Sequence, residues 1–167
     1  AEAALQAGAD LVNDIWGFKF DKKTALMTAK YNAACCLMHN KDEAVYNDFL
    51  EDMVSEMAEC VKIAREAGVA DDKIMLDPGV GFGKTYEMNL AAINHVDVLH
   101  RLGFPILLGT SRKSVIGNTL NLPADQRVEG TLATTVIGVM KNCAFVRVHD
   151  IKENKRIIQM TKAILAH

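Results

Sequence analysis

The sequence predicts an α/β fold of the TIM, or (β/α)8, barrel type, of which this chain would supply about five strands. Helical and extended patterns alternate from end to end, and the five extended runs are short and continuously apolar. Such runs are typical of strands covered on both faces, in a parallel sheet of right-handed βαβ units. Each run also ends in, or is followed at once by, polar residues, the arrangement from which barrel active sites are built.

The N-terminal half is predicted to hold three of these strands. Residues 1–7 have the pattern of a helix end, and Gly8 is suited to close it. Extended runs at 10–15 (DLVNDI), 33–38 (AACCLM) and 73–76 are the predicted strands, separated by helices at 22–32 and 46–67. The second helix is amphipathic, because apolar residues recur at spacings of three and four: Phe49, Met53, Met57, Val61 and Ala64.

The C-terminal half continues the alternation. A helix at 87–102 is stopped by Gly103, and the strand 105–108 (PILL) follows. A helical stretch after Ser111, a loop near Pro123 and a helix at 126–140 precede the last strand, 144–148, and the last helix, 154–166. Without an internal repeat or a low-complexity linker, residues 1–167 are predicted to form one domain.

The polar residues at the strand ends decide between two architectures. An open doubly wound sheet concentrates its site at one switch point, whereas a barrel brings all its strand ends to one face. Here all five predicted strands contribute, through Asn13 and Asp14, His39, Asp77, residues 111–113 and residues 147–150. A closed barrel needs eight strands, and the chain opens without Met inside a helix pattern. We therefore expect it to be N-terminally incomplete, with about three strands before Ala1.

Composition excludes several classes of protein. The net charge is −2, from 19 basic and 21 acidic residues without a basic stripe, so no nucleic-acid or membrane-surface partner is indicated. No apolar run is long enough to span a bilayer, and no signal-peptide pattern opens the chain. The four cysteines form no CxxC pair, which indicates free buried thiols in a reducing cytoplasm.

The stretch from Asp77 to Thr85 (DPGVGFGKT) carries the most information. It approaches a Walker A phosphate loop, but only three residues separate Gly79 from the Gly83-Lys84 pair where that motif needs four. An acid at a strand end followed by three glycines instead suggests close approach of a flat ligand. Asp77 would then accept paired hydrogen bonds from an aminopyrimidine edge. The alternative is that Asp77 only caps the Asp-Pro-Gly turn.

Two further stretches are candidates for binding an anion. The segment 109–114 (GTSRKS) follows a strand and opens a helix, so its amides, hydroxyls and basic side chains favour an anion, although an ordinary helix cap would look the same. Arg147 and His149 alternate along the last strand and project to one side, where charge-assisted bonds would hold a pyrophosphate. Structural ion pairing is the alternative for each.

Three other residues are weaker candidates for the site when each is judged from its neighbours in the sequence. Asn13 offers both a donor and an acceptor to a heterocycle, but Asn-Asp is also common in turns. A structural role is the better prediction for His39. Phe82, set among glycines, is placed to contact an aromatic substrate, although aromatic residues usually lie in the core.

Taken in order, these motifs resemble the dihydropteroate synthases of the pterin-binding barrel superfamily. The match runs through the whole chain, as LVNDIWG, LMH, DPGVGFGK, GTSRKSVIG, EGTLAT from Glu129, and RVHD. It implies a TIM barrel of the pterin-binding type, represented here by about strands 4–8. It also implies the reaction, in which 6-hydroxymethyl-7,8-dihydropterin diphosphate condenses with 4-aminobenzoate to give 7,8-dihydropteroate and diphosphate.

The resemblance also implies a role for each site residue. The pterin would be held by Asn13, Asp77 and Lys113, between apolar walls from Ile15 and Met38. The diphosphate would be bound by Asn13, Arg147 and His149, and 4-aminobenzoate or a competing sulfonamide by Ser114, Phe82 and Lys113. Lys113, Arg147 and His149 are the expected catalytic residues, in an SN1-like step without a covalent nucleophile.

The resemblance further implies Mg2+, bound with the diphosphate, and a homodimer formed through the late helices. The family's metal-binding Asn, its two flexible substrate loops and a pterin-binding Asp have no counterpart in these 167 residues. We therefore expect the 167 residues alone to be inactive or nearly so.

Three other functions compete with this one. A methyltetrahydrofolate-dependent corrinoid methyltransferase of the same superfamily would share the pterin-holding Asn and Asp, but it would not need the two anion sites. A non-catalytic pterin- or anion-binding domain would bind pterin diphosphate without turnover. A generic barrel with structural polar turns would bind no pterin at all.

Overall fold

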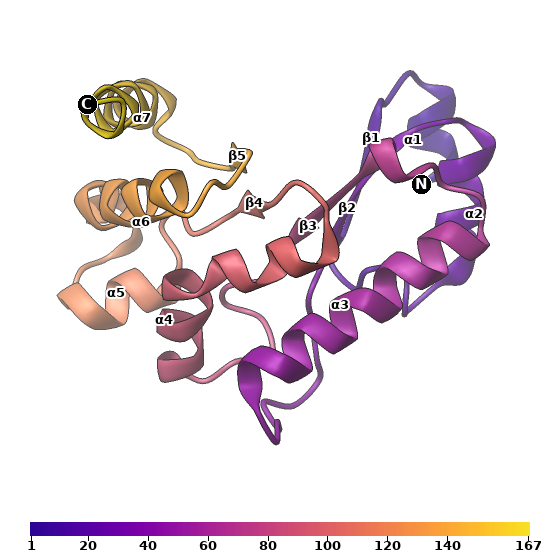
Figure 1. The fold of residues 1–167 in the computed structure, drawn as a ribbon, viewed down its shortest axis with the longest axis horizontal. Helices are drawn as coiled ribbons and strands as arrows, with labels where there is room; N and C mark the ends of the chain where they lie inside the picture. Colours follow the sequence, from indigo (N-terminus) through magenta and orange to yellow (C-terminus); the bar gives the residue numbers. More distant parts are fainter.

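A computed structural model describes residues 1–167, and it alternates strands and helices as the sequence predicts (Figure 1). The strands are β1 Leu11–Asp14, β2 Ala34–Met38, β3 Ile74–Asp77, β4 Leu107–Leu108 and β5 Phe145–Val146. The α-helices are α1 Glu2–Gln6, α2 Lys22–Lys30, α3 Phe49–Glu66, α4 Tyr86–Asn94, α5 Ser114–Leu120, α6 Val128–Met140 and α7 Ile151–Leu165. None of the helices is both long and apolar enough to cross a membrane.

All the strand pairs are parallel and follow the order of the chain. β1, β2 and β3 form one sheet, β4 and β5 form a second, and a parallel bridge between Leu76 and Ile106 joins the two. A doubly wound sheet reverses its strand order at a switch point, and no such reversal occurs here. The sequential order agrees with an arc of a barrel, although the structure itself shows two open sheets.

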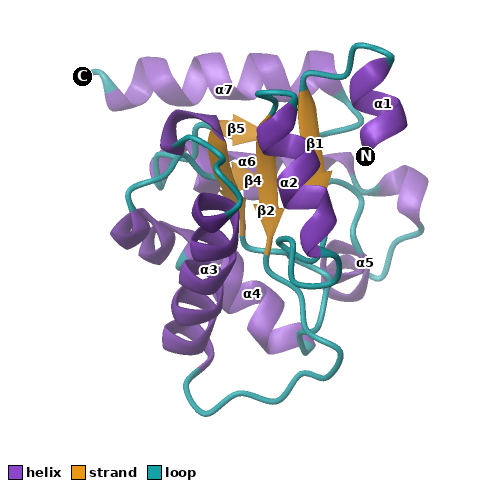
Figure 2. Ribbon diagram, turned by 90° about the vertical axis from the view of Figure 1, so that its right-hand side faces the viewer, coloured by secondary structure: helices purple, strands orange, loops and turns teal.

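One face of the strands is covered by helices, and the main core lies there. Alternate residues of β2 and β3, such as Leu37 and Leu76, are fully buried in a cluster of 23 hydrophobic residues. Helix α3 contributes Met53, Met57 and other residues of its apolar stripe to the same cluster. Figure 2 shows the strands in the middle of the molecule, behind α2 and α3.

The other face of the strands is more open. Leu11 at the start of β1 is 40% exposed and Phe145 of β5 is 48% exposed. Two residues further along each strand, on this same face, stand Asn13 and Arg147. The predicted site residues of these two strands therefore lie on the uncovered face.

The clearest differences from the predicted helices are at α3 and α4. The helix predicted to begin at 46 begins at Phe49, because Asp48 caps it by accepting from the amides of Leu50 and Glu51. The helix predicted over 87–102 is broken at His95, and residues 96–102 form a 3-10 helix that ends, as predicted, at the left-handed Gly103.

Candidate active site

The ends of three strands meet at Arg147. Its Nη1 donates to Asn13 Oδ1 at 2.9 Å and its Nη2 donates to Asp77 Oδ2 at 3.1 Å. The guanidinium lies over Gly109, where an added Cβ would stand 2.8 Å from Nη2. The prediction that these strand ends converge is thus confirmed for β1, β3 and β5, although Asn13 and Arg147 are 134 residues apart.

Asp77 serves a turn and the open face at the same time. Its side chain is fully buried, and Oδ1 accepts from the amide of Gly79 at 2.8 Å while Oδ2 faces Arg147. Burial raises the pKa of Asp77, against the opposing effects of the Gly79 amide, Lys113 and Arg147. Oδ1 of Asp77 therefore caps the turn, as the alternative predicted, while Oδ2 faces the open side of the strands.

The sequence left open whether Asn13 and Asp14 form a turn or face a ligand, and the structure gives these two places to different residues. Asp14 is the turn residue, since its Oδ1 accepts from the amides of Trp16 and Phe18 at 2.8 and 3.2 Å. Asn13 is exposed and points to the open face, where it meets Arg147.

Lys113 lies across the glycine loop, residues 77–84. Its Nζ donates to the carbonyl oxygen of Val80 and stands 5.0 Å from the centre of the Phe82 ring, and its stem passes 3.4 Å from the Cβ position of Gly81. Burial lowers the pKa of Lys113, and the nearby Asp77 acts in the opposite direction. Lys113 and Phe82, both predicted for the 4-aminobenzoate side, are thus in contact.

His149 is fixed through Ser111. The amide of His149 donates to Ser111 Oγ at 3.1 Å, so that hydroxyl can donate its own proton to His149 Nδ1, which lies 2.9 Å away. His149 Nε2 takes part in no hydrogen bond within the chain. Ser111 lies among the predicted strand-end residues 111–113, but its contact with His149 was not predicted.

Arg112 does not supply charge to an anion site, contrary to the prediction. Its guanidinium pairs with both oxygens of Asp150, at 2.7 and 3.3 Å, and its backbone is left-handed, with φ 60°. The charge of Arg112 is therefore already paired, and Lys113 is the remaining cation of this segment.

Three predicted contact residues make no hydrogen bond with the others. Met38 is 1% exposed and lies beside Gly79, on the same face as Asp77. Ile15 is 44% exposed, and Ser114 is exposed at the first turn of α5.

The glycines of the loop make room for protein backbone rather than for a flat ligand. A Cβ on Gly79 would stand 1.8 Å from the carbonyl oxygen of His39, and one on Gly83 would stand 2.4 Å from that of Lys41. Both glycines also have positive φ, 67° and 54°. The predicted approach of a ligand is wrong for these two positions, because the segment after β2 occupies the space.

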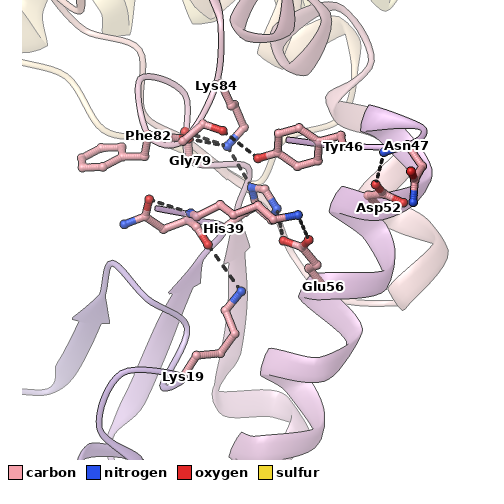
Figure 3. A network of polar contacts seen from close by, with 12 residues as sticks. Lys19, His39, Tyr46, Asn47, Asp52, Glu56, Gly79, Phe82 and Lys84 are labelled. Carbon is pink, nitrogen blue, oxygen red and sulfur yellow. Dashed lines mark hydrogen bonds and ion pairs between the residues drawn. The ribbon is translucent and has the colours of Figure 1, made fainter. Parts of the chain in front are cut away.

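A buried polar network beneath the loop was not predicted. Figure 3 shows Lys84 turned back under its own loop toward His39, which in turn faces Glu56 of α3. His39 is fully buried and hydrogen-bonded, which confirms its predicted structural role. Lys84 contacts the carbonyl oxygens of Gly79 and Phe82, so its ammonium group serves the loop itself, as the failed Walker A spacing implies.

Comparison with known proteins places this geometry in a family. Residues 1–149 match a family model described as pterin binding enzyme. The dihydropteroate synthase of Clostridium beijerinckii is 59% identical over 166 residues, which are 99% of this chain and 62% of that protein. The corresponding protein of Bacillus subtilis is 51% identical over 165 residues, 99% of this chain and 58% of that protein.

Solved structures agree with the sequence comparison. A crystal structure of the dihydropteroate synthase from Clostridium difficile, obtained in the presence of pteroic acid, superposes with a TM-score of 0.95 at 46% identity, covering 98% of this chain and 62% of that one. A Yersinia pestis dihydropteroate synthase in complex with a sulfonamide drug gives 0.94 at 34% identity, covering 99% and 62%. The chain spans about three fifths of the length of the curated relatives it matches. With a match over residues 1–149, the chain belongs to the family of pterin binding enzymes.

Proposed function

We propose that this chain carries the pterin and diphosphate part of a dihydropteroate synthase active site. The reaction would join 6-hydroxymethyl-7,8-dihydropterin diphosphate to 4-aminobenzoate, with release of diphosphate. The observation that carries the proposal is the meeting of Asn13, Asp77 and Arg147 on one open face. The names of the similar proteins, and the pteroic acid and sulfonamide of their solved structures, support the same reaction.

Asp77 and Asn13 are the proposed pterin contacts. A carboxylate accepts two parallel N–H bonds from an aminopyrimidine, and burial strengthens such bonds because water does not compete. Asn13 adds a donor and an acceptor at the neighbouring strand end. Lys113 would contact the same ring, and Met38 and Ile15 would supply its apolar walls.

Arg147 and His149 are the proposed diphosphate contacts. When the C–O bond breaks, negative charge develops on the leaving diphosphate, and positioned cationic or N–H donors stabilise it. His149 presents Nε2, because Ser111 holds Nδ1. The electron-rich pterin would share the positive charge left on its methylene, which 4-aminobenzoate, placed by Phe82, Ser114 and Lys113, would trap.

The residues of this chain do not form a site for the Mg2+ that the family resemblance implies. No group of three or more His, Cys, Asp or Glu side chains could hold a metal ion. The oxygens of Asp77 and Asn13 already accept from Gly79 and Arg147. No step proposed here therefore passes through the metal, whose protein ligands would have to come from outside these residues.

The assembly proposed for the parent protein is a closed (β/α)8 barrel that dimerises in the cytoplasm. The parallel, sequential strands support the barrel, and residues 1–167 would form part of this single domain. Exposed apolar side chains on the late helices, among them Met140, Met160 and Ile164, support a homodimer there. Four free cysteines agree with a reducing compartment.

Calorimetry combined with a turnover assay tests the proposal. Pterin diphosphate should bind, and Asp77→Asn should weaken this binding by about tenfold or more, because a neutral amide replaces a buried charged acceptor. Asp72→Asn, on the exposed surface, is the matched control. Binding without any turnover in the parent protein would favour a non-catalytic binding domain, and the absence of pterin binding would refute both functions.

A further inference from the structure

Lys84 uses all of its hydrogen-bonding capacity inside the protein. An ammonium group has three N–H donors. Those of Lys84 point to His39 Nδ1 at 2.8 Å and to the carbonyl oxygens of Gly79 and Phe82, both at 3.0 Å (Figure 3). None is left for a ligand or for water.

The contact with Glu56 fixes the tautomer of His39. Because a carboxylate can only accept, the ring proton of His39 resides on Nε2, which donates to Glu56 Oε2 at 3.0 Å, and Nδ1 is left as the acceptor for Lys84. Burial is the main cause that lowers the pKa of His39 to about 2, so the ring stays neutral. Burial also lowers the pKa of Lys84, to about 7. The Lys84 amino group is thus connected to the Glu56 carboxylate through a neutral imidazole.

Glu56 and Tyr46 anchor this arrangement to the segment from Asn40 to α3. The second oxygen of Glu56 accepts from Lys41 at 2.6 Å, and Tyr46 Oη donates to the carbonyl oxygen of Gly83 at 2.7 Å. The underside of the glycine loop is therefore bonded to two other parts of the chain.

The two lysines hold three carbonyl groups of the loop. Lys84 binds those of Gly79 and Phe82 from beneath, and Lys113 binds that of Val80. The Phe82 ring then lies against the Lys113 ammonium. Any movement of the loop would displace both side chains together.

We propose that Lys84, supported by His39 and Glu56, is a positioning residue that sets the place of Phe82 and Lys113 on the 4-aminobenzoate side of the site. The inference rests on the proposed function for its substrate, but its structural part stands on the contacts alone. Lys84 acts through the loop and touches no reacting atom.

Hydrogen exchange tests the structural part without any substrate. Lys84→Met keeps the length of the side chain and removes all three donors. We expect amide exchange in residues 79–83 to rise about tenfold or more, the equivalent of about one lost charge-assisted bond. Lys62→Met is the matched control, since Lys62 on α3 is 74% exposed, and it should leave this loop unchanged. Loop exchange within twofold of the wild type in Lys84→Met would overturn the proposal.

A second pair of variants separates positioning from loss of folding. In His39→Gln, the amide can still accept from Lys84 and donate to Glu56, whereas His39→Leu can do neither. We expect the glutamine variant to keep most of the loop protection and the leucine variant to lose it. Equal exchange in the two variants would contradict the relay to Glu56.

Kinetics in the intact parent protein tests the functional part. Lys84→Met should raise the KM for 4-aminobenzoate about tenfold and weaken pterin diphosphate binding less, about threefold, because Asn13 and Arg147 lie at the ends of other strands. Unchanged KM with a disordered loop would refute the role on the substrate side. If the wild-type protein neither binds pterin diphosphate nor turns over, the proposed function fails, and the exchange experiment still decides on Lys84.

Discussion

Replacing Gly79 with alanine tests how tightly the glycine loop packs on the segment after β2. The added Cβ would stand 1.8 Å from the carbonyl oxygen of His39, whereas real Cβ atoms stay at least 3.0 Å from such an atom. Gly103 is the matched control, because its φ is +81° against +67° for Gly79 and nothing lies within 4 Å of its Cβ position. Both variants place alanine in the left-handed region, but only Gly79→Ala also meets backbone.

The two free energies of unfolding should therefore differ. Alanine in the left-handed conformation costs about 1–2 kcal/mol, and this cost applies to both variants. In Gly79→Ala the loop must also move off His39, which breaks the bond from the Gly79 amide to Asp77 and the bond from Lys84 to the Gly79 carbonyl. At about 1–2 kcal/mol for each bond, the expected loss is about 3–6 kcal/mol, against about 1–2 for Gly103→Ala.

Urea unfolding followed by circular dichroism measures both values, provided that the slope of free energy against urea is the same in all three proteins. Gly79→Ala should also weaken pterin diphosphate binding, because the moved turn no longer holds Asp77. Equal destabilisation of the two variants, within about 0.5 kcal/mol, would refute the close packing of the loop on His39.

Three further predictions concern stability, and urea unfolding measures each of them. Asp48→Ala should cost about 1 kcal/mol, since it removes the N-cap of α3, and an unchanged midpoint would contradict that role. Met57→Ala should cost about 2–5 kcal/mol, because this fully buried side chain would leave a cavity; a cost below about 1 kcal/mol would contradict its packing. Lowering the pH from 7.5 to 5 should cost about 2 kcal/mol through His39, because the unfolded chain, with its ordinary pKa of 6.5, binds a proton that the folded chain refuses down to about 2. His39→Gln should remove this part of the pH dependence, and an unchanged dependence would refute its assignment.

The order of elements could be predicted because it rests on local patterns. The apolar spacing in α3 and the glycine at 103 depend only on neighbouring residues, and Gly103 closes its helix as expected. The break of the helix at His95 could not be predicted, since residues 87–102 are helical in pattern throughout. It depends on tertiary packing, which buries Val96 and Leu99.

The site could be predicted only where the fold class itself brings residues that are distant in the sequence close together. Asn13 and Arg147 were expected on one face because parallel strand ends converge, and the structure joins them directly. The pairing of Arg112 with Asp150 and of Lys84 with His39 depends on side-chain geometry across 38 and 45 residues. No periodicity or spacing carries that information, and the glycines of the loop were misread for the same reason.

The bonds of Arg147 couple the two halves of the proposed substrate. Its guanidinium now donates to Asn13 and Asp77, the acceptors that a pterin would need. A diphosphate would draw Arg147 into charge-assisted bonds of its own and release both acceptors. Because a buried Asp77 cannot remain unpaired without cost, the pterin should enter more favourably once the anion is bound, and linkage makes this effect reciprocal. We expect pyrophosphate to raise the affinity for a pterin without the diphosphate group several-fold in calorimetry, and Arg147→Ala to abolish the increase. Equal pterin affinity with and without pyrophosphate would mean that Arg147 does not exchange partners.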